Sequence, residues 1–295
     1  MDNDFAGFFA QVTIIIPAKN EANGLEKILP EIRGEFSQAE IIVVDDGSSD
    51  ETPNVAKKFA DKVVSHPYSK GNGAAIKSGV RAADRAFLLF MDADGQHRPQ
   101  DITRLVQISI SGSYDLVVGA RTIEGQAGVH RAIANGLYNR LASWMVGHKV
   151  EDLTSGFRLT RADKFRKFLY LLPNGFSYPT TSTMCFFRAG YSVAYCPILA
   201  PKRIGKSHIR LLRDGARFVL IIFKIGTLYS PLKLFLPISF SFFLTGLSYY
   251  LYTFFAYHRF TNMSALLFIT SVLVFLIGLV SEQITGLAFK ETNDD

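Results

Sequence analysis

The chain has 295 residues, two of them cysteines, and carries a formal net charge of +6 at pH 7. This length allows one large domain or two ordinary ones. Cys185 and Cys196 cannot build a disulfide framework and lack the spacing of a zinc site, which excludes a disulfide-stapled protein and indicates a reducing compartment. The acidic N-terminus lacks the charged and then apolar pattern of a secretory signal, so we expect none.

Hydrophobic and basic residues are distributed unevenly. Nearly all long apolar runs lie after Phe218, whereas the preceding part of the chain has the composition of a soluble α/β domain. A basic cluster just before the apolar region comprises Arg188, Lys202, Arg203, Lys206, Arg210, Arg213, Arg217 and Lys224. Beside a hydrophobic segment, the natural partner of such a cluster is an anionic membrane surface. We therefore predict a lipid bilayer and no nucleic acid among the partners.

Strand and helix patterns alternate along the first part of the chain. We predict strands at residues 12–16, 40–44, 62–65, 86–91 and 115–118, and helices at 24–33, 52–60, 74–83, 99–111 and 131–146. This alternation is typical of βαβ units, so the predicted fold class is α/β with a mainly parallel sheet flanked by helices. In such sheets, ligands bind at the carboxyl ends of the strands.

Two carboxylates follow the apolar strand at 87–91. Asp92 and Asp94 lie two positions apart, so on extended backbone their side chains point the same way and can converge on one cation. Oxygen ligands suit Mg²⁺ or Mn²⁺, which usually hold substrate phosphates as well. An EF-hand loop is excluded because Thr103 occupies the position of its bidentate glutamate. A polar turn after a core strand is the alternative.

Polar residues also follow two other predicted strands, at 17–21 and at Asp45 and Asp46. Three such clusters at one edge of a sheet indicate a nucleotide site. The glycines Gly71 and Gly73 do not complete the dinucleotide-binding fingerprint, and no phosphate loop of the Gly-Lys-Ser/Thr type is present in the sequence. A standard NAD protein and a P-loop NTPase are therefore excluded.

Six short motifs in series resemble a known family. They are IIPAKNE at 15–21, VDDGSSD at 44–50, MDADGQH at 91–97, GAR at 119–121, DLTSGFR at 152–158 and RIGKS at 203–207. In order and spacing, the first three resemble the family-two inverting glycosyltransferases of GT-A fold. The last three resemble the polyprenyl-phosphate branch, of the dolichyl-phosphate mannose synthase type. The resemblance covers about residues 11 to 210.

The resemblance implies roles for individual residues. Those that would hold the nucleoside, or lie beside it, are Pro17, Ala18, Glu21, Asp45 and Asp46. Those that would hold the metal ion, and through it the donor diphosphate, are Asp92, Asp94 and Gln96. Those that would meet donor or acceptor phosphates are Arg121, Arg131 and Arg203, with Ser155, Arg158 and Ser207 also at the substrate.

Asp152 is the candidate catalytic base, with an orienting role as an equal alternative, and Asp94 and Arg121 complete the predicted catalytic set. For Gln96 and Arg131, solvent-facing positions remain open, and for residues 155–158 a structural turn before a strand is the alternative. Residues 171–183 carry no motif of the family, and we expect sugar choice to reside there. The Gln-x-x-Arg-Trp motif of processive relatives is absent because the single tryptophan, Trp144, lies in another context, which favours a single transfer.

The remainder of the chain has a membrane pattern. Residues 207–230 carry a cationic stripe beside an apolar face, which predicts an amphipathic helix on the membrane surface. Apolar runs at about 234–256 and 263–288 are long enough to form a two-helix transmembrane hairpin within 231–295, leaving 1–206 as the catalytic domain. The linker has one cation, Arg259, so the positive-inside rule predicts a multi-pass protein whose catalytic domain is cytoplasmic.

The sequence thus predicts a membrane-anchored enzyme that moves one sugar from a nucleotide-sugar to a polyprenyl phosphate, undecaprenyl or dolichyl, with inversion and Mg²⁺ or Mn²⁺. Two alternatives stay open: a transferase of the same fold acting on a lipid or glycan hydroxyl, and a non-catalytic nucleotide-sugar-binding membrane module. A homo-oligomer is a further expectation.

Overall fold

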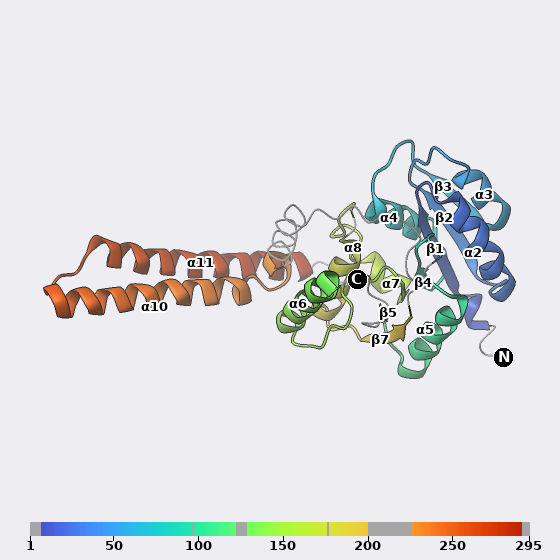
Figure 1. Cartoon of the computed structure of the whole chain (residues 1–295). Helices are drawn as coiled ribbons and strands as arrows, with labels where there is room; N and C mark the ends of the chain where they lie inside the picture. Colours follow the sequence, from blue (N-terminus) through green and yellow to red (C-terminus); the bar gives the residue numbers. More distant parts are fainter. Residues whose placement is uncertain (1–6, 96, 122–128, 176, 200–225, 291–295) are drawn as a thin grey trace. The chain divides into compact units, whose positions relative to one another are not determined.

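The computed structural model describes residues 7–95, 97–121, 129–175, 177–199 and 226–290, with the main chain only at 129–135 and 288–290. The described residues belong to two compact units. One contains a sheet with its helices, and the other contains two long apolar helices (Figure 1).

The first unit is built on a seven-stranded sheet of order β3-β2-β1-β4-β6-β5-β7. Its strands are β1 (Val12–Ala18), β2 (Glu40–Asp45), β3 (Lys62–Ser65), β4 (Phe87–Phe90), β5 (Leu116–Arg121), β6 (Arg158–Arg161) and β7 (Val193–Ile198). All neighbouring pairs are parallel except those of β6, which is antiparallel to both β4 and β5. The mixed, mainly parallel α/β sheet confirms the predicted fold class.

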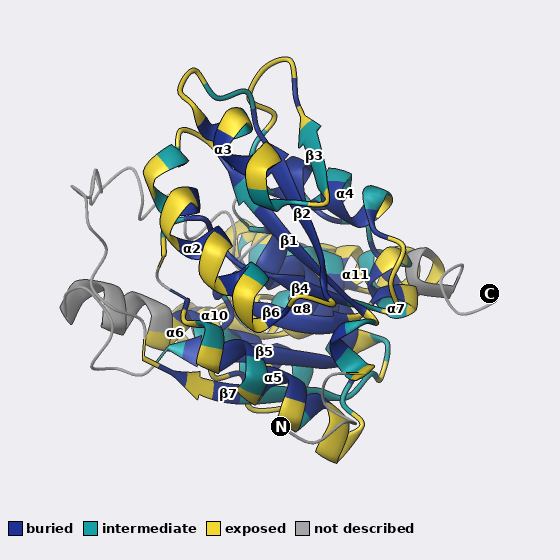
Figure 2. Cartoon of the chain, turned by 90° about the vertical axis from the view of Figure 1, so that its right-hand side faces the viewer, coloured by how far each residue is buried: buried dark blue, intermediate teal, exposed yellow. Residues whose placement is uncertain are grey.

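Helices cover both faces of this sheet. They are α2 (Ala22–Glu35), α3 (Thr52–Phe59), α4 (Asn72–Ala82), α5 (Pro99–Gly112), α7 (Ala162–Arg166) and α8 (Tyr178–Arg188), and a further helix, α6 (Val129–Val146), follows β5 along the chain. Ile14 and Ile16 of β1 share one hydrophobic core with α2, α3 and α5. Ile15, between them, faces α4, where a Cβ on Gly79 would lie 2.4 Å from its methyl group. The central strands are therefore buried on both sides, whereas the edge strands β3 and β7 are partly exposed (Figure 2), because successive side chains point to opposite faces.

Local sequence accounts for several boundaries. Pro53 and Pro99 lie in the first turns of α3 and α5, where the missing N–H has no helical partner to lose. The β-branched runs of β1 and β2 suit a pleated, buried strand. The predicted helices and strands of the first 121 residues match the observed ones within a few residues. β6 begins where the sequence left open a turn before a strand, and β7 has no counterpart among the predicted strands.

The second unit is a hairpin of α10 (Pro231–Tyr257) and α11 (Asn262–Lys290). Both helices are long and apolar enough to cross a membrane, and most of their side chains are exposed in the unit. The helices contact each other through small and polar residues: Ser239 Oγ donates to the Ser271 carbonyl at 2.8 Å, and Ser271 Oγ returns a bond to the Ser239 carbonyl at 2.9 Å. Glu282 Oε2 accepts from the Leu232 N–H at 3.2 Å, in the first turn of α10. The predicted amphipathic helix lies largely outside the described residues.

Candidate active site

The carboxyl ends of the parallel strands meet at one edge of the sheet. Ala18 pairs with Asp45 there, and Phe90 at the end of β4 pairs with Arg158 at the start of antiparallel β6. Arg121 ends β5, which runs in the same direction as β4. The fold therefore brings the predicted residues of five separate motifs to one edge, as the sequence pattern predicts for a ligand site.

Side chains tie the loop after β1 to the loop after β2. Ser48 Oγ accepts from the Asn20 N–H at 2.9 Å, and Asn20 Oδ1 accepts from the Ser49 N–H at 2.8 Å. Thr52 Oγ1 accepts from the Glu21 N–H at 2.9 Å. Pro17, Ala18, Glu21 and Asp45 thus lie on two loops that hold each other, a rigid frame for the predicted nucleoside site.

Asp46 has an internal role that the sequence did not reveal. Its carboxylate is buried and accepts from Ser69 Oγ at 2.7 Å and from the backbone N–H groups of Lys70 and Gly71 at 2.8 and 2.9 Å. His66 Nδ1 lies 2.7 Å from the same carboxylate. Burial alone would raise the pKa of Asp46, but these hydrogen bonds outweigh it and lower the pKa to about 2. Asp46 therefore organises the loop before α4, and its place beside a nucleoside stays a prediction.

The N-terminus of α4 is occupied by another segment of the chain. The Gly73 and Ala74 N–H groups donate to the carbonyls of Gly175 and Asn174, both at 3.1 Å. Lys77 Nζ donates to Asn174 Oδ1 at 2.5 Å. A Cβ at Gly73 would come within 2.1 Å of the Pro173 carbonyl oxygen, so the segment docks only on glycine. A dinucleotide would place its phosphates on N–H groups at such a helix N-terminus. In this protein, those N–H groups already donate to residues 174 and 175.

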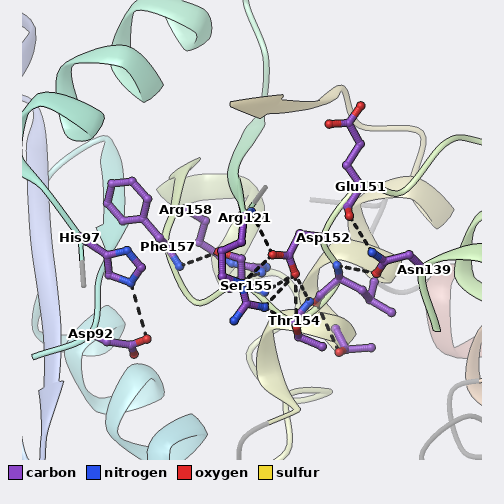
Figure 3. Close-up of polar contacts among 12 residues, drawn as sticks. Asp92, His97, Arg121, Asn139, Glu151, Asp152, Thr154, Ser155, Phe157 and Arg158 are labelled. Carbon is purple, nitrogen blue, oxygen red and sulfur yellow. Dashed lines mark hydrogen bonds and ion pairs between the residues drawn. The ribbon is translucent and has the colours of Figure 1, made fainter. Parts of the chain in front are cut away.

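Asp92 and Asp94 follow β4 directly, and both are partly exposed. A Cβ on Gly156 would lie 3.4 Å from each carboxylate oxygen of Asp92, so the motif that contains Gly156 lies against this carboxylate. His97 Nε2 lies 3.6 Å from Asp92 Oδ2 (Figure 3). Within the described ranges no three His, Cys, Asp or Glu side chains form a metal cage. Two carboxylates fit a Mg²⁺ or Mn²⁺ ion whose other ligands come from a bound diphosphate.

Asp152 and Arg121 form a bidentate ion pair. Arg121 Nε lies 2.8 Å from Oδ2 and Nη2 lies 3.0 Å from Oδ1 of Asp152 (Figure 3). The Arg121, Thr154 and Ser155 N–H groups donate to the same carboxylate at 3.0–3.2 Å. Burial alone would raise the pKa of Asp152, but the hydrogen bonds and charge of Arg121 and the backbone donors lower it. A carboxylate with so many donors is a poor proton acceptor, so this geometry favours the orienting role.

Arg158 is fully buried, an unusual position for a guanidinium. Nη1 donates to the Pro179 carbonyl at 2.9 Å and to Ser182 Oγ at 2.7 Å, and Nη2 donates to the Ser155 carbonyl. Arg158 therefore connects the first turn of α8 to the loop of Ser155 and Gly156. Its predicted contact with substrate, like that of buried Ser155, stays a prediction.

Four predicted residues cannot be placed: Gln96, Arg203 and Ser207 lie outside the described residues, and the side chain of Arg131 is not described. Sequence reasoning in turn missed the roles of His66, Lys77 and Phe157. The Phe157 ring packs on β5, where a Cβ at Gly119 would lie 2.5 Å from it, which explains the glycine of the GAR motif. No local pattern reveals such pairs because their partners are distant in sequence.

Comparison with known proteins decides the family. Residues 13–169, more than half of the chain, match the model of glycosyl transferase family 2. The chain belongs to this family. Residues 230–287 match a second model, described as the GtrB C-terminal hairpin, which covers the two apolar helices.

This family 2 glycosyltransferase is similar to proteins with named activities. It is 31% identical over 205 residues to a polyprenol monophosphomannose synthase of Mycolicibacterium smegmatis, covering 64% of this chain and 77% of that protein. It is 28% identical over 211 residues to a dolichyl-phosphate hexose transferase of Haloferax volcanii, covering 70% of this chain and 90% of that protein. The predicted family, the enzyme class and the two-helix C-terminal hairpin are thereby confirmed.

Among solved structures, glucosyl-3-phosphoglycerate synthase from Mycobacterium tuberculosis, crystallised with Mn²⁺ and UDP, superimposes on this family 2 glycosyltransferase with a TM-score of 0.59 at 21% identity. The alignment covers 75% of this chain and 80% of the other. At this identity the likeness shows the GT-A fold and nothing more.

Proposed function

We propose that this protein transfers one sugar from a nucleotide-sugar to a polyprenyl phosphate, with inversion at the sugar carbon. The relatives named as polyprenol monophosphomannose synthase and dolichyl-phosphate hexose transferase support this acceptor. Family membership and the named enzymes argue against the non-catalytic module. A glycosyltransferase acting on a hydroxyl acceptor is the remaining alternative.

The observation that most supports a phosphate acceptor is the pairing of the Asp152 carboxylate with Arg121. A hydroxyl acceptor must lose its proton during attack, so it needs a general base of suitable pKa. The candidate base, Asp152, has a lowered pKa and is held by Arg121 and three backbone N–H groups. A phosphate monoester needs little help, since its second proton leaves near about pH 6. The locked carboxylate therefore favours a phosphate acceptor.

The predicted cofactor is Mg²⁺ or Mn²⁺ held by Asp92, Asp94 and Gln96, which would stabilise the negative charge that develops on the leaving nucleotide diphosphate. Arg121 lies at the same edge, and its Nε and Nη2 donate to Asp152 and Thr154, which fix the plane of the guanidinium, so Nη1 is the nitrogen that would meet an incoming phosphate. The side chain of Arg121 is 31% exposed, which allows that contact. Arg131 and Arg203 would add further phosphate contacts, and Ser207 would lie close to them.

For the membrane, we propose that residues 207–230 lie on its surface and that α10 and α11 cross it, with the catalytic domain in the cytoplasm. The cation asymmetry of the sequence supports this orientation. A cysteine introduced at Asn262, in a background without Cys185 and Cys196, should react with an impermeant thiol reagent outside intact cells. Labelling only after cell lysis would contradict a hairpin that crosses the membrane.

The function is tested by incubating purified protein with UDP- and GDP-sugars, Mn²⁺ and undecaprenyl or dolichyl phosphate, and weighing the lipid product. We expect one hexose added per lipid, and the anomeric configuration of the product, read by NMR, opposite to that of the donor. The matched control is the corresponding free polyprenol, which has a hydroxyl and no phosphate. Equal rates with phosphate and alcohol would contradict the proposal and favour the hydroxyl-acceptor alternative.

A further inference from the structure

His97 occupies an unusual position beside the candidate metal site. His97 follows the Asp-Ala-Asp motif by three positions, and it is only 7% exposed. Its imidazole stacks on the ring of Phe157, with centroids 4.5 Å apart and an angle of 11° between the planes. Figure 3 shows the ring between Phe157 and the carboxylate of Asp92. The stacking on Phe157 thus holds the ring in its orientation.

Neither nitrogen of this buried ring has a hydrogen-bond partner among the described residues. Buried polar groups are almost always paired, because an unpaired one keeps the cost of its desolvation. A phenyl ring would fill the same slot without that cost. Stability of the fold therefore does not account for a histidine at this position.

The polar group nearest to the His97 ring in Figure 3 is the Asp92 carboxylate. The Asp92 side chain is 41% exposed, whereas that of His97 is 6% exposed, so the imidazole approaches the carboxylate from the protein interior. The separation of 3.6 Å between His97 Nε2 and Asp92 Oδ2 is too long for a hydrogen bond. A shift of about 0.7 Å would bring the two atoms to hydrogen-bond distance.

We propose that His97 is a positioning residue for Asp92. When a nucleotide and its divalent cation bind, the His97 Nε2–H donates to Asp92 Oδ2 and fixes the carboxylate in the orientation that holds the ion. Groups behind a metal ligand commonly act in this way. The step requires only a proton on Nε2. It rests on the proposed function only in taking a metal-bound nucleotide as the ligand.

The experiment compares two substitutions at His97 with one control, all in the full-length protein. His97→Phe keeps the stacking on Phe157 but removes the donor, and His97→Gln keeps a donor near the Nε2 position but removes the ring. The control is His148→Phe, because His148 also stacks on a phenylalanine, Phe187, at an angle of 11°. Binding of UDP and of GDP is measured with Mn²⁺ and without it, and the melting temperature of each apo-protein is recorded.

For His97→Phe we expect a melting temperature equal to that of the wild type or about 2–4 °C higher, because unpaired nitrogens leave the core. The same variant should bind the nucleotide with Mn²⁺ about tenfold more weakly, with no change for the nucleotide alone. His97→Gln should melt lower yet retain Mn²⁺-dependent affinity within about threefold of the wild type. The Michaelis constant for the lipid should stay unchanged in both variants, and His148→Phe should match the wild type in binding.

If His97 served only to stabilise the fold, the melting temperatures and nucleotide affinities would change in the opposite way. If His97→Phe melts more than about 4 °C lower, the nitrogens stabilise the fold and the proposal is wrong. It is also wrong if His97→Phe binds the nucleotide with Mn²⁺ as tightly as the wild type does. A wild-type protein that binds neither nucleotide would contradict the proposed function itself, and the melting temperature of His97→Phe would still decide whether the ring is kept for stability.

Discussion

The unit that contains the sheet, the catalytic unit, and the C-terminal hairpin of α10 and α11 bury opposite kinds of side chain. In the catalytic unit, β2 is buried along its whole length, and the core is formed by isoleucine, leucine, valine and phenylalanine. In the hairpin, Phe255 is 74% and Leu287 is 66% exposed, whereas Ser239, Ser271 and Thr253 are buried. A helix in lipid gains nothing by hiding leucine, and helices associate there through small residues and hydrogen bonds. The two units are thus folded for different solvents.

The comparison also concerns the strength of polar contacts. In the catalytic unit, the carboxylates of Asp46 and Asp152 each have four or more hydrogen-bond partners, and both lie at the sheet edge where we predict the active site. In the hairpin, the contacts between Ser239 and Ser271 each join a single hydroxyl to a carbonyl, and one backbone N–H, that of Leu232, donates to Glu282. Substitutions should therefore have large effects on activity in the first unit and small effects on stability in the second.

The largest expected effect is that of Asp94→Asn. The substitution keeps the shape of the side chain but removes the charge that a divalent cation requires, so activity should fall on the order of 100- to 1,000-fold. The melting temperature should stay within a few degrees of the wild type because Asp94 is partly exposed. The control is Asp84→Asn, whose side chain is 78% exposed before β4, at the other end of the strand. Near-normal turnover of Asp94→Asn with unchanged Mn²⁺ dependence would remove this residue from the metal site.

Asp152→Asn should reduce both activity and stability. Arg121 would lose its bidentate partner, so unfolding should cost about 2 kcal/mol less, and misorientation of the guanidinium should slow transfer on the order of 100-fold. Asp115→Asn is the matched control, because Asp115 pairs with Lys164 at 2.5 Å just before β5, away from the candidate site. That control should lose stability and keep activity. If both variants lose activity to the same extent, the loss in Asp152→Asn comes from general destabilisation of the sheet and not from misorientation of Arg121.

The pH dependence of stability should reflect Asp46. Its pKa falls from 3.8 to about 2 on folding, so it contributes about 2 kcal/mol of stability above pH 4, and this contribution is lost as the pH falls toward 2. Denaturant unfolding of wild type and Asp46→Asn, compared at pH 7 and pH 3, measures it. The difference between the two proteins should shrink by roughly half at pH 3. A difference that does not change with pH would mean that the carboxylate has the same pKa in both states.

The smallest effect should be that of Ser239→Ala in the hairpin. The substitution removes one of two reciprocal hydrogen bonds and should lower the free energy of unfolding in detergent by about 1 kcal/mol, with activity unchanged. Ser248→Ala, at an exposed position of the same helix, is the control and should have no measurable effect. A loss of several kcal/mol at Ser239 would show that the hairpin is held together as the core of a water-soluble protein is.

Much of this architecture was predictable, because its signals are local. Short runs of apolar residues, most of them rich in valine and isoleucine, predict the strands of the first 121 residues, since a buried strand and the turn after it each depend on neighbouring residues. The two long apolar runs predict the hairpin, because about 20 helical residues span a hydrocarbon core. Motif order was sufficient to indicate the family and the carboxylates at the strand ends.

Only the tertiary structure determined which polar groups pair with each other. The sequence left Asp152 as either a base or an orienting group, and the pairing with Arg121, 31 positions away, favours orientation. It gave no sign that Asp46 would be enclosed by its own loop or that Lys77 would hold Asn174, 97 positions away. It also did not show that His97 would be buried with both nitrogens unpaired. Strand periodicity is a property of neighbours in the chain, whereas hydrogen bonding and burial depend on which distant segments the fold brings together.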